Sequence, residues 1–197
     1  MQIRINGDTV TIEGYVNAVE RRSKPLQSRI GQFVERICKG AFKKAIERND
    51  NIRLLLNHDW ERDLGGTKDG NLELAEDSIG LHARAEITDA EVAKKARNGE
   101  LVGWSFGFTD RDVDQHDENG MPTRDVKDLD LYEVSILDRS KQPAYDGTLV
   151  SVRSDECTIC HGALFAQEIN TRDDTAEEPK EIDYTEYDQL IKDLKGE

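Results

Sequence analysis

The chain has 197 residues, of which 36% are apolar and 35% are charged. That length is enough for one domain with a core and a short appendage, and no apolar run approaches the roughly 20 residues of a membrane-spanning helix. The N-terminus lacks the basic and then apolar layout of a signal peptide, so we expect an intracellular protein.

The net charge of −14 is unevenly spread along the chain. Residues 154–197 hold 13 acidic and 4 basic residues, whereas residues 1–153 hold 28 acidic and 23 basic residues. Such a balance argues against non-specific binding to nucleic acid or to anionic membranes. The change in composition predicts a body over residues 1–153 and a flexible or partner-dependent tail over residues 154–197.

The first half of the chain is predicted to be strands with one helix. Apolar and polar residues alternate around "NGD", which predicts a strand, a turn and a strand over residues 2–18. The apolar residues of "GAFKKAIERND" fall on one face of a helix. Further strands are expected at residues 29–37, 51–59, 71–75 and 79–87, and a loop at residues 19–28.

The second half begins with a helix, since Thr88 and Glu91 have the spacing of a capping box and Asn98-Gly99 is a stop signal. The segment "LVGWSFGF" (101–108) is expected as a strand, followed by a polar segment at 110–124 and a strand at 128–137. Residues 142–153 close the body, and an amphipathic helix is possible at 184–195.

About seven strands and two helices predict a mainly β fold of the α+β type. We expect a mostly antiparallel, closed or nearly closed β-barrel with the helices packed outside it. A ferredoxin-like α+β sheet is the competing architecture.

Three residues on different predicted strands could form a hydrolytic site. His58 ends an apolar strand, Ser105 lies inside "GWSFGF", and Glu133 lies inside "LYEVSIL". A serine nucleophile needs a base within hydrogen-bond reach, and the base needs a third group that orients it. Spacing alone also allows a histidine bonded to backbone, a serine that permits close packing, and a glutamate that faces solvent.

The segment "CTICH" places Cys157, Cys160 and His161 in a pattern used for haem attachment and for half of a zinc site. Haem attachment requires export, for which no signal is seen. The tail supplies only three zinc ligands, and Cys38 lies in the predicted body. We therefore expect reduced cysteines and no metal or organic cofactor, with a zinc-dependent module as an alternative.

Several stretches, taken in order, resemble the prohead protease family of tailed phages, the serine peptidases of capsid maturation. They are "IEGYVNAVE", "FVERICKGAFKKAI", "LLLNHDWERDLGGTKDGNLELAED", "GLHARAEI", "NGELVGWSFGF", "LDLYEVSIL" and "PAYDGTLVSVR". The resemblance implies that His58 is the general base and Ser105 the nucleophile. The family is similar to the herpesvirus assemblins, β-barrel proteases with a second histidine at the third position. Glu133 is the natural occupant of that position here, and Asp59 and His82 are alternatives.

The resemblance also implies proteolysis inside the assembling prohead, in the host cytoplasm. The expected substrates are the scaffold protein, or a scaffolding segment of the major capsid protein, and the protease itself. A homodimer is expected, without nucleic acid or membrane as partner. The glycines beside Ser105 are expected to leave room for a substrate backbone. The alternative is a non-catalytic scaffold or capsid-interaction protein that keeps the fold.

Overall fold

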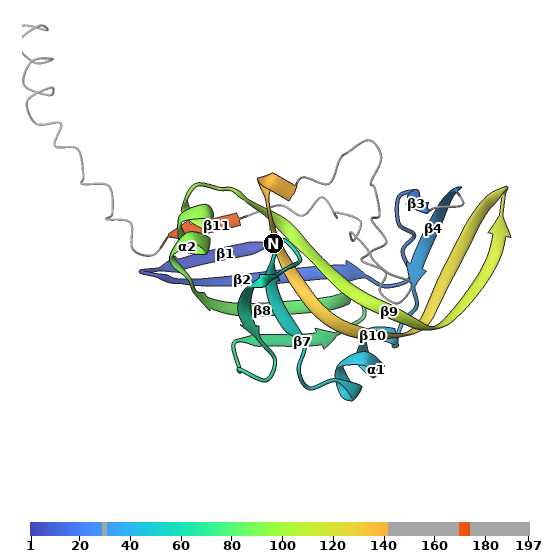
Figure 1. Cartoon of the computed structure of the whole chain (residues 1–197), viewed down its shortest axis with the longest axis horizontal. Coiled ribbons are helices and arrows are strands. Elements are labelled where there is room, and N and C mark those ends of the chain that lie inside the picture. Colours follow the sequence, from blue (N-terminus) through green and yellow to red (C-terminus); the bar gives the residue numbers. More distant parts are fainter. Residues whose placement is uncertain (29–30, 142–169, 174–197) are drawn as a thin grey trace, which may run out of the picture.

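The computed structural model describes residues 1–28, 31–141 and 170–173 (Figure 1). These residues contain eleven strands, the helices α1 (Ala41–Arg48) and α2 (Ala90–Arg97), and the short 3-10 helix η1 (Arg139–Lys141). The prediction of a mainly β protein with two helices is therefore confirmed. The predictions for residues 142–153, Cys157, Cys160, His161 and residues 184–195 lie outside the described residues.

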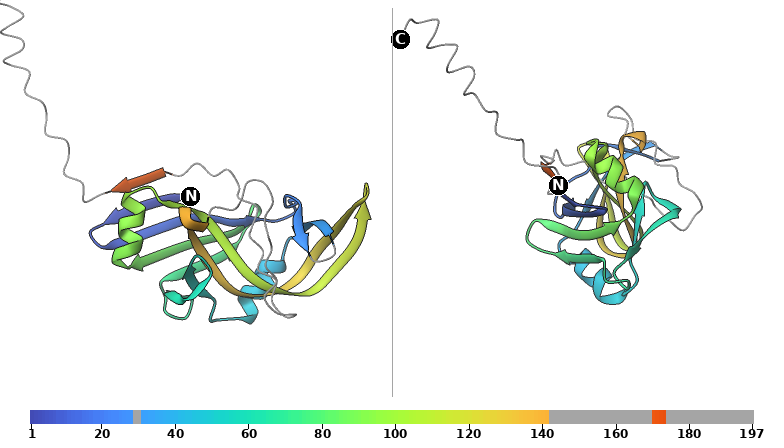
Figure 2. Two further views of the ribbon diagram at one scale, coloured as in Figure 1. Left: turned by 45° about the horizontal axis from the view of Figure 1, so that its top comes forward. Right: turned by 90° about the vertical axis from the view of Figure 1, so that its left-hand side faces the viewer.

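The first sheet is five-stranded. Its order is β11 (Asn170–Asp173), β1 (Gln2–Asn6), β2 (Thr9–Ala18), β8 (Gly80–Thr88) and β7 (Leu72–Glu76). Ile3 pairs with Ile12 across the antiparallel β1–β2 hairpin, and both are buried, as the alternating pattern predicted. Figure 2 shows β11 along the outer edge of β1, to which it pairs in parallel. A segment of the predicted tail thus joins this sheet, while the boundary near residue 153 stays a prediction.

The second sheet is built on two long strands, β9 (Leu101–Glu118) and β10 (Met121–Asp138), which form one hairpin. The other strands of this sheet are β3 (Leu26–Ser28), β4 (Gly31–Ile37), β5 (Arg53–Leu56) and β6 (Asp59–Gly66). The far part of the hairpin extends beyond the rest of the molecule together with β3 and β4 (Figure 1). We call this part, residues 109–128 with β3 and β4, the arm.

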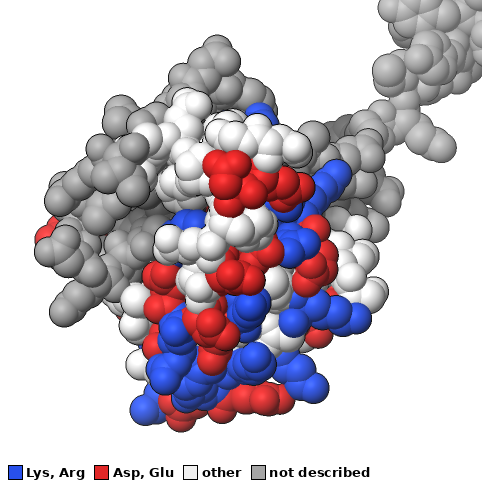
Figure 3. Space-filling view, turned by 90° about the vertical axis from the view of Figure 1, so that its right-hand side faces the viewer, with Lys and Arg blue, Asp and Glu red and all other residues white. Residues whose placement is uncertain are grey.

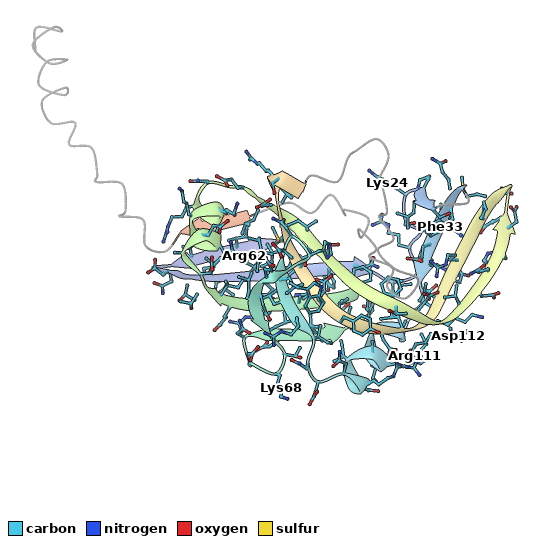
Figure 4. All side chains as sticks on the ribbon, viewed as in Figure 1. Lys24, Phe33, Arg62, Lys68, Arg111 and Asp112 are labelled. Carbon is cyan, nitrogen blue, oxygen red and sulfur yellow. The ribbon has the colours of Figure 1, made fainter. Side chains whose placement is uncertain are left out.

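The predicted polar segment 110–124 forms strand on both sides of a turn at Asn119 and Gly120, and its charges pair across the arm. Arg124 binds Asp110 of the neighbouring strand, and Lys127 lies 3.3 Å from Asp114. Figure 4 shows Arg111 and Asp112 near the bend of the hairpin and Phe33 on β4. At the end of the arm, acidic and basic side chains interleave rather than forming a patch of one sign (Figure 3).

Helix α1 fills a gap along one edge of β10. Strand β9 pairs with β10 along the whole length of the opposite edge. Strands β4 and β5 therefore both pair in parallel with the edge that α1 covers, one on each side of the helix. Between them, Arg48 donates to the carbonyl of Leu129 (3.2 Å) and Asn49 donates to that of Leu131 (2.8 Å). The helix thereby satisfies β10 carbonyls that no strand reaches. This arrangement fixes β5 against the second half of β10.

Side chains of both sheets form one apolar core. The sheets do not close into a barrel, so the predicted barrel is not confirmed. More strands form than the seven expected, partly because a turn at Asn57-His58 divides the predicted strand 51–59 into β5 and β6. Residues 26–28 of the predicted loop also form β3.

The two helices are capped by different means, and the N-cap of α2 differs from the prediction. The N-cap of α2 is Asp89, whose side chain accepts from the amide of Val92 (2.9 Å), rather than Thr88. Helix α1 has no side-chain cap of its own, and Glu76 of β7 accepts from the amides of Gly40 and Lys43 instead. Among the described residues, no helix has the length and apolar character needed to cross a membrane.

Candidate active site

His58 is the second residue of a two-residue hairpin turn between β5 and β6. Asn57 and His58 have φ angles of 60° and 59°, and a type I′ turn needs positive φ at both of its central residues. Asparagine and histidine adopt this conformation more readily than most residues. The amide of Asn57 donates to the carbonyl of Ile136 (2.9 Å), which holds the turn against β10. The predicted strand-end histidine is thus a turn residue.

A hydrogen bond joins two of the three predicted site residues. His58 Nδ1 lies 2.7 Å from Glu133 Oε1. The other carboxylate oxygen, Oε2, accepts from the hydroxyl of Ser135 at 2.6 Å. Glu133 is 3% exposed, which excludes the alternative of a glutamate that faces solvent. A buried carboxylate bound to an imidazole is the arrangement that fixes the tautomer of a catalytic histidine.

An extra residue in β10, Tyr132, turns Glu133 away from the apolar core. Leu131 pairs with Phe108 and Glu133 pairs with the next residue of β9, Gly107, so Tyr132 has no partner and forms a bulge. Before the bulge the odd-numbered Leu131 joins the core, and after it the even-numbered Val134 does. Without the bulge, the period of two would place Glu133 among the apolar side chains.

The register of β9 and β10 places Ser105 beside Ser135, which contacts both His58 and Glu133. Ser105 pairs with Ser135 in the antiparallel β9–β10 ladder, so the two side chains are direct neighbours on one face of the sheet. The oxygen of Ser135 accepts from the backbone amide of His58 at 3.0 Å. Ser105 is 0% exposed. The structure thus brings Ser105, His58 and Glu133 together from three strands or turns that are distant in sequence.

Gly107 lies directly against the carboxylate of Glu133. A Cβ at this position would lie 2.5 Å from Glu133 Oε1 and 3.2 Å from Glu133 Cδ. The absence of a side chain therefore makes room for the carboxylate, while the expected room for a substrate backbone stays a prediction. No sequence pattern pointed to this contact, because it depends on the register of β9 and β10.

The substitution Gly107→Ala is expected to lower any catalytic activity of this site by about 100-fold, because the new methyl group must push the carboxylate away from His58. Overpacking should also cost about 1–3 kcal/mol of unfolding free energy. Enzyme kinetics and urea unfolding measure the two effects. The matched control is Gly7→Ala, at a distant turn with φ of 60° and open space for a Cβ, which costs stability through backbone strain alone. Equal losses of activity in both variants would contradict the steric explanation.

A second set of contacts supports the turn from the other side. The amide of Asp138 donates to Asn57 Oδ1 at 3.0 Å, and the carboxylate of Asp138 binds Lys95 Nζ of α2 at 2.9 Å. Asp138 is 3% exposed, and burial alone would raise its pKa. Hydrogen bonds from Lys95, Ser140 and Asn57 outweigh burial and hold the pKa of Asp138 well below its ordinary value. This cluster ties α2 and the end of β10 to the residue before His58.

The substitution Lys95→Met is expected to lower the unfolding free energy by about 2–3 kcal/mol at pH 7, because it leaves the buried Asp138 carboxylate without its cation. The pKa of Asp138 is lowered on folding, so its stabilising contribution is present above the ordinary value of 3.8 and is lost as the pH falls below it. The difference between wild type and variant should therefore shrink below about pH 4 in unfolding experiments. The control is Lys94→Met, on the exposed face of the same helix. A difference that stays constant down to pH 2 would contradict the pairing.

Asp59 and His82 are the alternatives to Glu133 for the third site residue, and the contacts that the structure gives for them are to residues other than His58. Asp59 is exposed, and its carboxylate accepts from the amide of Glu61 at 2.9 Å. His82 lies on β8 of the other sheet, where it contacts the ring of Tyr15 and lies 3.5 Å from Glu13. The geometry therefore supports Glu133. In the described part of the chain, no cluster of histidine, cysteine and carboxylate side chains could hold a metal ion.

The family model of the caudovirus prohead serine proteases matches residues 1–160 of the chain. The matched range includes the hairpin turn at His58 and both strands that carry Ser105 and Glu133. Neither a curated protein nor a solved structure matches the chain.

Proposed function

The chain belongs to the caudovirus prohead serine protease family, and on this premise we propose that Ser105, His58 and Glu133 carry out its proteolysis. The protein is a serine protease of capsid maturation, acting within the phage prohead in the host cell. The observation that supports the residue assignment is the bond from His58 Nδ1 to Glu133 Oε1, beside the strand position of Ser105.

In the proposed mechanism, Ser105 Oγ attacks the scissile carbonyl while His58 Nε2 takes its proton. Glu133 accepts from Nδ1 and stabilises the imidazolium that forms. His58 then protonates the leaving amine, and a water molecule activated by His58 releases the acyl-enzyme. Backbone amides supply the oxyanion site. No step of this mechanism requires a cofactor.

The proposed substrates are the scaffold protein, or a scaffolding segment of the major capsid protein, together with the protease itself. We also propose a homodimer and a similarity to the herpesvirus assemblins. A non-catalytic role in scaffold or capsid binding is the alternative. It offers no reason for a buried carboxylate that is bound to a histidine beside a buried serine.

The test of the substrates is co-expression of the protein with the capsid and scaffold proteins of the same phage. Mass spectrometry should find defined truncated forms of the capsid or scaffold protein that are absent when the protease is omitted. Intact capsid and scaffold proteins, in the presence of folded protease and assembled proheads, would contradict the proposed substrates.

A further inference from the structure

Ser135 is a buried hydroxyl to which the sequence assigned no role. It lies on β10 two residues after Glu133, is 0% exposed, and pairs with Ser105 across the strands. Its oxygen touches the carboxylate of Glu133 at 2.6 Å and the backbone amide of His58 at 3.0 Å. One hydroxyl thus contacts both residues that would activate the nucleophile.

The partners of Ser135 fix the direction of its proton. A hydroxyl can donate one proton and can accept through its lone pairs. The amide of His58 is itself a donor, so the Ser135 oxygen accepts from it, and the Ser135 proton is directed to Glu133 Oε2. Its contact to His58 is through the backbone rather than the imidazole, so Ser135 lacks the base that a nucleophile needs.

We propose that Ser135 is a positioning residue for proteolysis, which holds the Glu133 carboxylate and the backbone of His58 in one fixed relation. This inference rests on the proposed roles of His58 and Glu133. By binding Oε2, Ser135 leaves Oε1 directed at His58 Nδ1. By accepting from the amide of His58, it also holds the positive-φ turn against β10.

Loss of the hydroxyl has a definite consequence for the pH dependence of activity. A buried carboxylate that loses one hydrogen-bond donor becomes more basic. It then either takes a proton itself or holds the proton on His58 more tightly. In both cases the pair of Glu133 and His58 releases its proton only at a higher pH, so the acid limb of the pH–rate profile moves upward.

The experiment compares Ser135→Ala with Ser135→Thr, which keeps the hydroxyl. Ser135→Ala is expected to lower kcat by about 10- to 100-fold and to raise the pH of half-maximal activity on the acid side, whereas Ser135→Thr restores both. The downfield proton signal of His58 Nδ1–H, recorded in the inactive Ser105→Ala background, should shift in the double variant with Ser135→Ala. This signal reports on the hydrogen bond to Glu133 without any need for turnover. If Ser135→Ala does not fold, Ser135→Cys fills the same space with a weak donor and takes its place.

Three outcomes are separated by these measurements. A normal rate, pH profile and proton signal in Ser135→Ala would overturn the role of Ser135 and leave the roles of Ser105, His58 and Glu133 intact. A reduced rate without any change in the pH profile or the proton signal would reduce Ser135 to a packing residue and overturn the proposal. Activity in Ser105→Ala together with complete loss in Ser135→Ala would instead overturn the assignment of Ser105 as the nucleophile.

Discussion

Replacing Ser105 with alanine is expected to abolish cleavage of capsid or scaffold protein, with a loss of at least about 10⁴-fold in kcat. The hydroxyl oxygen, which is the proposed nucleophile, is the only heavy atom that the substitution removes. Ser105 is fully buried between Trp104 and Phe106 on β9, both of which join the apolar core, so the strand should keep its packing. The variant should therefore fold and bind substrate while it cannot form an acyl-enzyme.

Two measurements check this expectation. Mass spectrometry of co-expressed capsid and scaffold proteins reports cleavage, and a fluorophosphonate probe reports the nucleophile by adding its mass to Ser105 of the wild type alone. The matched control is Ser78→Ala, in the exposed turn between β7 and β8. It should retain both cleavage and labelling. Continued processing by folded Ser105→Ala would disprove the serine-protease assignment of this residue.

Local patterns were sufficient for much of the fold. The alternation around "NGD" predicted the β1–β2 hairpin, and the apolar face of "GAFKKAIERND" predicted α1, because both patterns arise from neighbours in sequence. The strands of the arm within residues 110–124 were not predicted, because these residues are mostly polar. These strands are tied by cross-strand ion pairs such as Arg124–Asp110, which a hydrophobic pattern cannot reveal.

The three expected site residues came from chemistry and resemblance, whereas their surroundings depend on long-range register. Glu133 meets His58 because β5 pairs in parallel with β10 and because Tyr132 bulges out of the ladder. Neither the parallel pairing nor the bulge can be recognised from neighbouring residues in the sequence. The contacts of Ser135 and Gly107 with Glu133 could therefore not be predicted. The Asn57–His58 pair is compatible with a tight turn, since both residues tolerate positive φ. The apolar run before it instead favours a strand that ends at His58.

The bulge at Tyr132 connects fold and chemistry. It lets one strand contribute apolar side chains to the core on both sides of the site while its polar residues, Glu133 and Ser135, meet the turn that carries His58. Bulges commonly re-aim side chains in this way at functional sites. The site is therefore held by rigid strands and one turn rather than by a long loop, which favours precise geometry.

The second large effect is expected for Glu133→Gln, which should lower kcat by about 10³- to 10⁴-fold while keeping the size of the side chain. In the wild type, two donors face the carboxylate, the Ser135 hydroxyl at Oε2 and His58 Nδ1 at Oε1. A glutamine offers one acceptor oxygen and one donor NH₂ group. If the NH₂ group faces His58, the imidazole is turned to the wrong tautomer; if it faces Ser135, the hydroxyl must accept from it and can no longer donate to residue 133. In both orientations the negative charge that stabilises the imidazolium is lost.

The alternatives for the third position supply the controls. Asp59→Asn and His82→Gln should each keep activity within about threefold of the wild type, because Asp59 is exposed and His82 lies on the other sheet. Glu133→Asp retains the charge but shortens the reach, so its loss should be smaller than that of Glu133→Gln. Cleavage kinetics on all four variants, with urea unfolding to confirm folding, decide the matter. If Glu133→Gln is fully active and Asp59→Asn or His82→Gln is not, the third position belongs to that residue, and the bond from His58 to Glu133 is structural.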